Sequence, residues 1–193
     1  MTSLTEIKHL SIGLAVFALV GFTMLIDSIP QLLLRAELLL MMVLGMLASF
    51  LAHELAHKVA AQKMGYWAEF RLSMPGLLLT LMSTVLPVKI VAPGAVRIIG
   101  LQMSWENLGK ISLSGPLTNI VQAVAYTAFL KLAGGLSWLI LYMLATLNLS
   151  LAFFNLIPIG PLDGAKIFKW SRSVWVCLII SVLAIWISLT TVL

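Results

Sequence analysis

The chain has 193 residues, of which 61% are hydrophobic and only 10% are charged, and its formal net charge is +5. A soluble domain has about 45–50% apolar and about 25% charged residues, so this composition excludes an ordinary soluble protein. It predicts a multi-pass membrane protein embedded in a lipid bilayer. The cations flank apolar runs, as in membrane proteins, and we therefore expect no nucleic-acid partner. The length fits a single transmembrane domain over residues 1–193, whose oligomeric state the sequence leaves open.

Five apolar segments are candidates for membrane-spanning helices, because each approaches the roughly 20 residues that cross a hydrocarbon core. In chain order they cover about residues 10–29, 32–61, 107–131, 136–157 and 174–193. The predicted fold class is therefore an all-α multi-pass membrane protein.

The segment of about residues 66–103, between the second and third helices, does not fit a spanning helix. Pro75, Gly76 and two further prolines interrupt it, and β-favouring runs occupy residues 83–86 and 88–91. A spanning helix over residues 77–92 is the alternative, but it is short and has an internal proline and lysine. We expect a small β element that is re-entrant or lies at the membrane interface.

An H-E-x-x-H motif, His53-Glu54-Leu55-Ala56-His57, lies inside the second predicted helix. Residues four apart share a helix face, about 6 Å apart along the axis, so both imidazoles can reach one zinc ion. Glu54 can then accept a proton from a water on that metal. Ionisable groups at membrane depth are costly, which favours a functional site over packing histidines.

A catalytic zinc usually has three protein ligands, and the sequence offers three acids for the third position. Glu69 and Glu106 both lie where water is expected, whereas Asp163 follows a proline- and glycine-rich break after the fourth helix. Asp163 can therefore approach the depth of His53 and His57. The alternative is that Asp163 caps the short helix that follows.

The positive charges predict the orientation of the chain. If the second helix ends in the cytoplasm, 10 of the 12 Lys and Arg residues lie on that side, and only Arg35 and Lys131 lie on the other. This asymmetry is the positive-inside pattern. We expect a cell-membrane protein with its site near the cytoplasmic face.

Three motifs make the chain resemble the site-2 protease family of intramembrane zinc metalloproteases. They are the H-E-x-x-H motif, Ser-Gly-Pro-Leu-Thr-Asn at residues 114–119, and the run of residues 155–164 that ends in Leu-Asp-Gly. The resemblance covers about residues 38–170 and implies one zinc per chain held by His53, His57 and Asp163. It also implies that Asn119 and Asn155 hold the substrate or the transition state. The form expected is a compact core, with neither a PDZ nor a CBS domain.

The expected activity is hydrolysis of a peptide bond within or near a transmembrane helix of a membrane-anchored protein, in regulated intramembrane proteolysis. Glu54 is the predicted general base, and Asn119 is the predicted donor to the oxyanion. An edge strand over residues 83–92, including Val88 and Ile90, is expected to hold the substrate by strand addition.

Two alternatives belong to other classes. A membrane H-E-x-x-H peptidase with a later glutamate ligand is disfavoured, because the sequence has no Glu after Glu106. A non-catalytic metal-binding scaffold or ion carrier leaves Glu54 without a role, because pure binding needs no carboxylate that is not a ligand.

Overall fold

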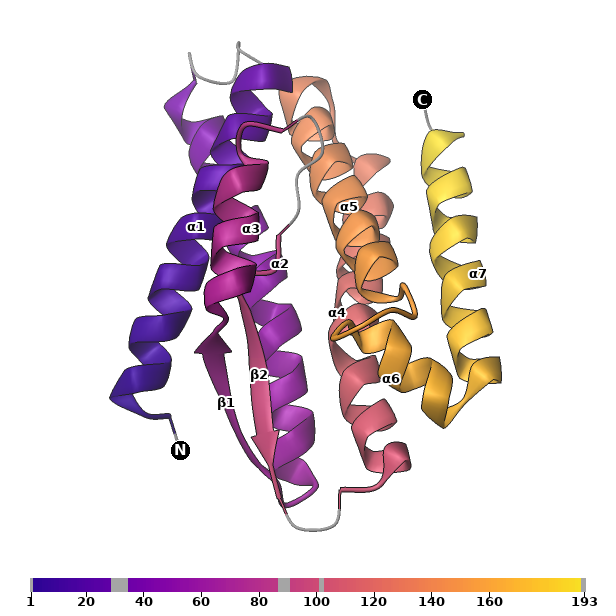
Figure 1. Ribbon diagram of the computed structural model, residues 1–193. Helices are drawn as coiled ribbons and strands as arrows, with labels where there is room; N and C mark the ends of the chain where they lie inside the picture. The colour runs from indigo at the N-terminus through magenta and orange to yellow at the C-terminus, as the bar shows by residue number, and fades with distance from the viewer. Residues whose placement is uncertain (1, 29–34, 87–90, 101–102, 192–193) are drawn as a thin grey trace.

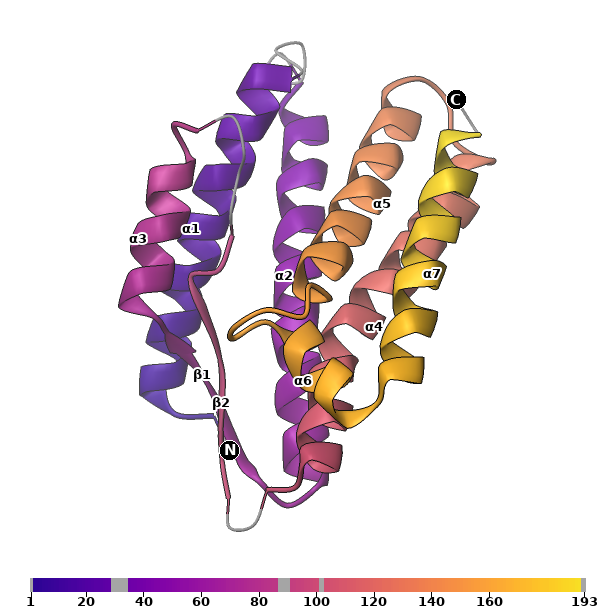
Figure 2. The same ribbon diagram turned by 45° about the vertical axis from the view of Figure 1, so that its right-hand side comes forward.

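The computed structural model describes residues 2–28, 35–86, 91–100 and 103–191, and it is mainly helical (Figure 1). Helix α1 (Leu4–Ser28) runs beside α2 (Ala36–Lys63), which extends from one end of the bundle to the other. Helices α4 (Trp105–Leu130), α5 (Gly135–Asn155) and α7 (Arg172–Thr190) follow, and the short α6 (Asp163–Trp170) lies between α5 and α7. Figure 2 shows α1 on one side of α2, with α4 to α7 on the other.

Four of the described helices are long and apolar enough to cross a membrane. These are Leu4–Thr23, Ala36–Lys63, Gly135–Asn155 and Arg172–Thr190. α4, where we also predicted a spanning helix, has 26 residues but is less apolar. Its polar residues include Ser112 and Asn119, which are buried inside the bundle. The chain is therefore a helical membrane protein, as its composition predicts.

The segment between α2 and α4 leaves one end of the bundle and returns to that end (Figure 1). It contains β1 (Trp67–Leu72), helix α3 (Met74–Ser83) and β2 (Gly94–Ile99), and the two strands pair antiparallel with Phe70 opposite Val96. A small re-entrant β element is thus present, as predicted.

The strand predicted over residues 83–86 was wrong. Residues 74–83 form α3, and residues 84–86 form a turn after it. Pro75 and Gly76 were interpreted as helix breakers, but Pro75 lies in the first turn of α3, where its missing N–H leaves no hydrogen bond unmade. The Ser73 side chain caps this turn by accepting from the Gly76 N–H at 3.3 Å. Val88 and Ile90 lie outside the described residues.

Aromatic packing joins the sheet to the helices. Phe17 of α1 stacks on Phe50 of α2 with ring centroids 5.1 Å apart, and Phe50 meets the edge of Phe70 of β1 at 6.0 Å. All three side chains are buried. Such aromatic pairs contribute about 0.5–1.5 kcal/mol beyond the burial of their area, so they hold the sheet against the turn of α2 that precedes the H-E-x-x-H motif.

The backbone between α5 and α6 is irregular, and residues 158–161 within it are exposed. Non-helical backbone survives at membrane depth only where the protein satisfies its polar groups. Here the Trp175 indole N–H of α7 donates to the Leu156 carbonyl at 2.7 Å, and the Leu162 N–H donates to the Ile159 carbonyl at 3.3 Å. This break allows α6 to begin beside the middle of α2.

Candidate metal centre and active site

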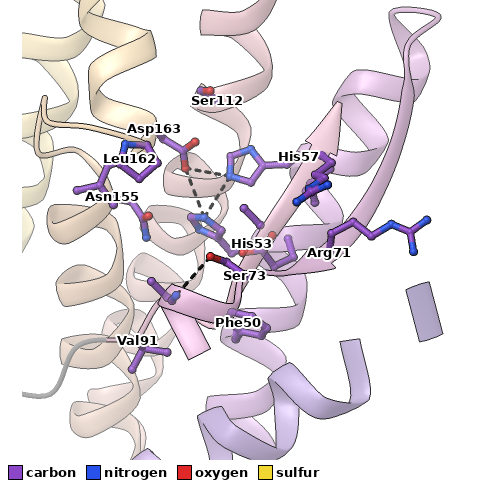
Figure 3. A pocket seen from close by; sticks show the side chains of 18 of the residues that line it. Phe50, His53, His57, Arg71, Ser73, Val91, Ser112, Asn155, Leu162 and Asp163 are labelled. Carbon is purple, nitrogen blue, oxygen red and sulfur yellow. Dashed lines mark hydrogen bonds and ion pairs between the residues drawn. The ribbon is translucent and has the colours of Figure 1, made fainter. Parts of the chain in front are cut away.

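Three side chains from two distant parts of the chain converge on one point (Figure 3). The Nε2 atoms of His53 and His57 are 3.1 Å apart, and Asp163 Oδ2 lies 3.6 Å from the former and 3.0 Å from the latter. The histidines come from successive turns of α2, and Asp163 is the first residue of α6. All three residues are buried.

This donor set fits a zinc ion. Tetrahedral ligands at about 2.0–2.1 Å from zinc are roughly 3.3–3.4 Å apart, which is close to the separations of these three atoms. A carboxylate oxygen and two imidazole nitrogens repel one another unless a cation or a proton lies between them. Within the described residues, His53, His57 and Asp163 form the one group of histidines, cysteines and acids that could hold a metal.

The other nitrogen of each imidazole faces an acceptor, and this fixes the tautomer. His57 Nδ1 donates to the Ile111 carbonyl at 2.9 Å, and His53 Nδ1 donates to Asn119 Oδ1 at 2.5 Å. With the proton on Nδ1, each Nε2 lone pair points toward the proposed metal. Hydrogen bonds of this kind orient metal-ligating histidines and raise their basicity.

Glu54 lies beside the metal group without belonging to it. Its carboxylate accepts a backbone hydrogen bond from Val96 of β2, and its buried Oε2 has no partner among the described residues. A buried oxygen without a partner requires an explanation. A reacting water at the metal would supply one, because Glu54 lines the same cavity as His53 and His57.

Two glycines make room for the centre. A Cβ on Gly115 of α4 would lie 2.3 Å from His57 Nε2 and 2.7 Å from His53 Cε1. A Cβ on Gly164 would lie 2.1 Å from the Leu156 carbonyl oxygen, at the point where α6 starts against the end of α5. The Ser-Gly-Pro and Leu-Asp-Gly motifs therefore have a steric basis, because side chains there would displace the metal-binding residues.

The centre opens into a cavity of about 560 Å³ between α2, β2 and the segment before α6. Asn155 lines it near Leu162 and Asp163 (Figure 3). The Asn155 amide donates to the Leu151 carbonyl at 2.9 Å, and its second N–H has no hydrogen bond to the described residues. The role of Asn155 in substrate binding stays a prediction.

The outer edge of β2 borders this cavity. The Phe70 N–H turns away from β2 and donates to Glu6 Oε1 at 3.0 Å. Phe70 is opposite Val96, and in an antiparallel pair of this kind both residues direct their backbone groups away from the partner strand. Val96 therefore directs its backbone polar groups toward Glu54. In the described part of the chain, β1 is the only strand paired with β2.

Two site predictions need correction. Asn119 does not line the cavity, and its side-chain nitrogen donates to Asn148 Oδ1 at 2.9 Å and to the Ser49 carbonyl at 3.4 Å. It therefore has no N–H for an oxyanion, and it acts on His53 instead. The edge strand was expected over residues 83–92, of which 87–90 lie outside the described residues, whereas the described strand that borders the cavity is β2.

The interpretation of Asp163 as a helix cap is also excluded. Leu162 is the N-cap residue of α6, and this helix start has no side-chain cap hydrogen bond. Asp163 instead presents Oδ2 to the histidines, while Oδ1 accepts from Lys166 Nζ at 3.4 Å. Sequence reasoning gave no role to Asn148 or Ser49, although an asparagine in a span as apolar as α5 is itself a signal.

Comparison with known proteins agrees with this geometry. A model described as Peptidase family M50 matches residues 132–175, which include Asn155 and Asp163. Over those residues the chain is similar to this family, the site-2 proteases. It is 38% identical over 123 residues to a protein of Methanocaldococcus jannaschii whose provisional name is zinc metalloprotease MJ0611.

That alignment covers 61% of this chain and 63% of the relative, so the chain spans less than two thirds of the relative's length. No solved structure gives a significant match. The comparisons therefore show a sequence similarity, and the geometry of the candidate metal centre comes from this chain alone.

Proposed function

We propose that this site-2 protease homologue is an intramembrane zinc metalloendopeptidase that binds one zinc ion per chain and cleaves a membrane-anchored protein within or near its transmembrane helix. The observation that carries the proposal is the position of Glu54. Glu54 lines the cavity beside a group of three buried candidate metal ligands, and its own buried Oε2 has no partner among the described residues. A metal-binding scaffold or ion carrier would have no use for this carboxylate.

His53, His57 and Asp163 would hold the zinc. When bound, zinc lowers the pKa of water toward about 7 and polarises a carbonyl as a Lewis acid. Glu54 would accept the proton of the attacking water at Oε2 and return it to the leaving amine. The free N–H of Asn155 is the side-chain donor best placed to bind the substrate carbonyl as charge develops on its oxygen.

The outer edge of β2 supports strand addition as the mode of substrate binding. An intact helix hides its carbonyls in its own hydrogen bonds, so the substrate must unwind before cleavage. An extended peptide paired with β2 at Val96 would keep its backbone satisfied at membrane depth, and it would pass next to Glu54. The positive-inside pattern supports a site near the cytoplasmic face of the cell membrane.

The direct test uses purified protein in liposomes with a membrane-anchored substrate that carries a tag at each end. Wild type should cut the substrate within or near its membrane segment, as mapped by mass spectrometry. Glu54→Gln should retain one zinc per chain by elemental analysis and lose several orders of magnitude in rate. Cleavage by Glu54→Gln at the wild-type rate would exclude Glu54 as the base.

A further inference from the structure

A continuous chain of polar side chains connects His53 to the interior of the bundle, away from the cavity. Asn119 of α4, Asn148 of α5 and Ser49 of α2 are all 0% exposed. Asn119 Nδ2 donates to Asn148 Oδ1 at 2.9 Å, and Asn148 Nδ2 donates to Ser49 Oγ at 2.8 Å. The Ser49 hydroxyl donates in turn to the Gly45 carbonyl at 2.8 Å.

Two backbone carbonyls give this chain a fixed direction. A carbonyl oxygen can only accept, so the Asn148 atom 2.9 Å from the Leu144 carbonyl must be the nitrogen. Asn148 Oδ1 then faces Asn119. The Asn119 atom 3.4 Å from the Ser49 carbonyl must likewise be the nitrogen. Asn119 Oδ1 is left to face His53, whose Nδ1 must then carry the proton.

We propose that Asn148 is a positioning residue for the metal centre: it orients the Asn119 amide, and the oriented amide sets the His53 tautomer that leaves Nε2 free for zinc. Without Asn148, the Asn119 amide can rotate and present its NH₂ group to His53. Nδ1 would then become the acceptor, and the proton would move to Nε2, where it blocks metal binding. The relay acts through Asn119 and touches neither the metal nor the substrate.

The function of this relay rests on the zinc site proposed above, but its structural core can be tested without zinc. The chain has three histidines, so a protein labelled with ¹⁵N at histidine gives a spectrum in which each ring can be assigned. In metal-free wild type at alkaline pH, His53 should be the Nδ1–H tautomer. In Asn148→Leu, a mixture of both tautomers is expected. A wild-type His53 with its proton on Nε2 would overturn the relay, whether or not the protein binds zinc.

The second measurement is zinc affinity, determined by competition with a chelator. Asn148→Leu should bind zinc about 10- to 100-fold more weakly, as is typical when a hydrogen-bond partner behind a metal ligand is lost. Thr146→Val on the same helix is the matched control, because the Thr146 hydroxyl is buried without a partner among the described residues. It should leave the affinity unchanged.

Asn119→Asp separates orientation from general packing damage. A carboxylate has two acceptor oxygens and needs no partner to choose between them. Adding Asn148→Leu to Asn119→Asp should therefore change zinc affinity less than threefold and leave the His53 tautomer intact. The same loss of about 10- to 100-fold in both backgrounds would show that Asn148 supports the bundle only, and the proposal would be abandoned.

Discussion

The carboxylate of Glu6 lies 2.5 Å from the ammonium group of Lys58, the residue that directly follows His57. The other Glu6 oxygen accepts the Phe70 N–H of β1, so one buried carboxylate joins the first turns of α1 to both the metal-binding helix and the sheet. This contact joins α2, one residue beyond His57, to strand β1 through a segment far from both in sequence.

Replacing one partner of this ion pair should destabilise the protein. Glu6→Gln would leave the Lys58 charge buried beside a neutral amide, and breaking a buried pair in this way costs about 3–5 kcal/mol. The double variant Glu6→Gln with Lys58→Met removes both charges and should recover part of that loss. Denaturant-induced unfolding in detergent measures both variants. Equal stability of Glu6→Gln and wild type would mean that the pair does not form.

A methyl group at Gly115 should abolish metal binding. The Cβ of Gly115→Ala would lie 2.3 Å from His57 Nε2, so the ring must leave the position that zinc requires. Zinc content should fall well below one per chain, with little change in helix content by circular dichroism. Gly134→Ala is the control, because a Cβ there has no atom within 4 Å. Full zinc occupancy in Gly115→Ala would contradict the close approach of α4 to the histidines.

Removal of Asp163 should eliminate both zinc and activity. Asp163→Ala takes away the oxygen that lies 3.0 Å from His57 Nε2, and it leaves two protein ligands where a catalytic zinc usually has three. Substitutions that can coordinate, such as Asp163→His, should retain some metal, and Asp163→Ala should retain none. Elemental analysis of the purified variants decides this, and an Asp163→Ala protein with one zinc per chain would move the third ligand elsewhere.

The return of the chain after β2 predicts which positions share a side of the membrane. In a Cys177→Ser background, which removes the chain's one cysteine, single cysteines replace Lys63, Lys110, Lys131 or Lys169. An impermeant thiol reagent applied outside intact cells should label only position 131, because α2 ends and α4 begins at one end of the bundle (Figure 1). Labelling from outside at position 110, with position 63 protected, would mean that the segment between them crosses the membrane.

Most of the long helices and the pairing of His53 with His57 were predictable because their signals are local. Hydropathy depends on consecutive residues, and the four-residue spacing of His53 and His57 fixes their common face on any α-helix. Asp163 followed by elimination, since a costly acid at membrane depth needs a cation. Residues 66–103 then had to return to the side of the membrane where they began, because one more crossing would put Asp163 near the surface opposite to His53 and His57.

The β element shows where local signals misled. A proline ends a helix at most positions, but it is favoured in the first turn, where Pro75 lies in α3. Only the structure of the chain around α3 distinguishes the two cases. We assigned strands to β-favouring runs near Val88. The strand that borders the cavity is β2, and it pairs with β1, which begins about 27 residues before it in the chain. The antiparallel register runs from Trp67 opposite Ile99 to Leu72 opposite Gly94.

The sequence by itself predicted a helical membrane protein and the residues of a candidate zinc site. Only the tertiary structure decided what Asn119 does, because its partners lie 66 residues away at His53 and 29 residues away at Asn148. An asparagine can donate or accept, and its role depends on which groups face each end of the amide. Those groups are brought together by the packing of α2, α4 and α5, which no local pattern in the chain encodes.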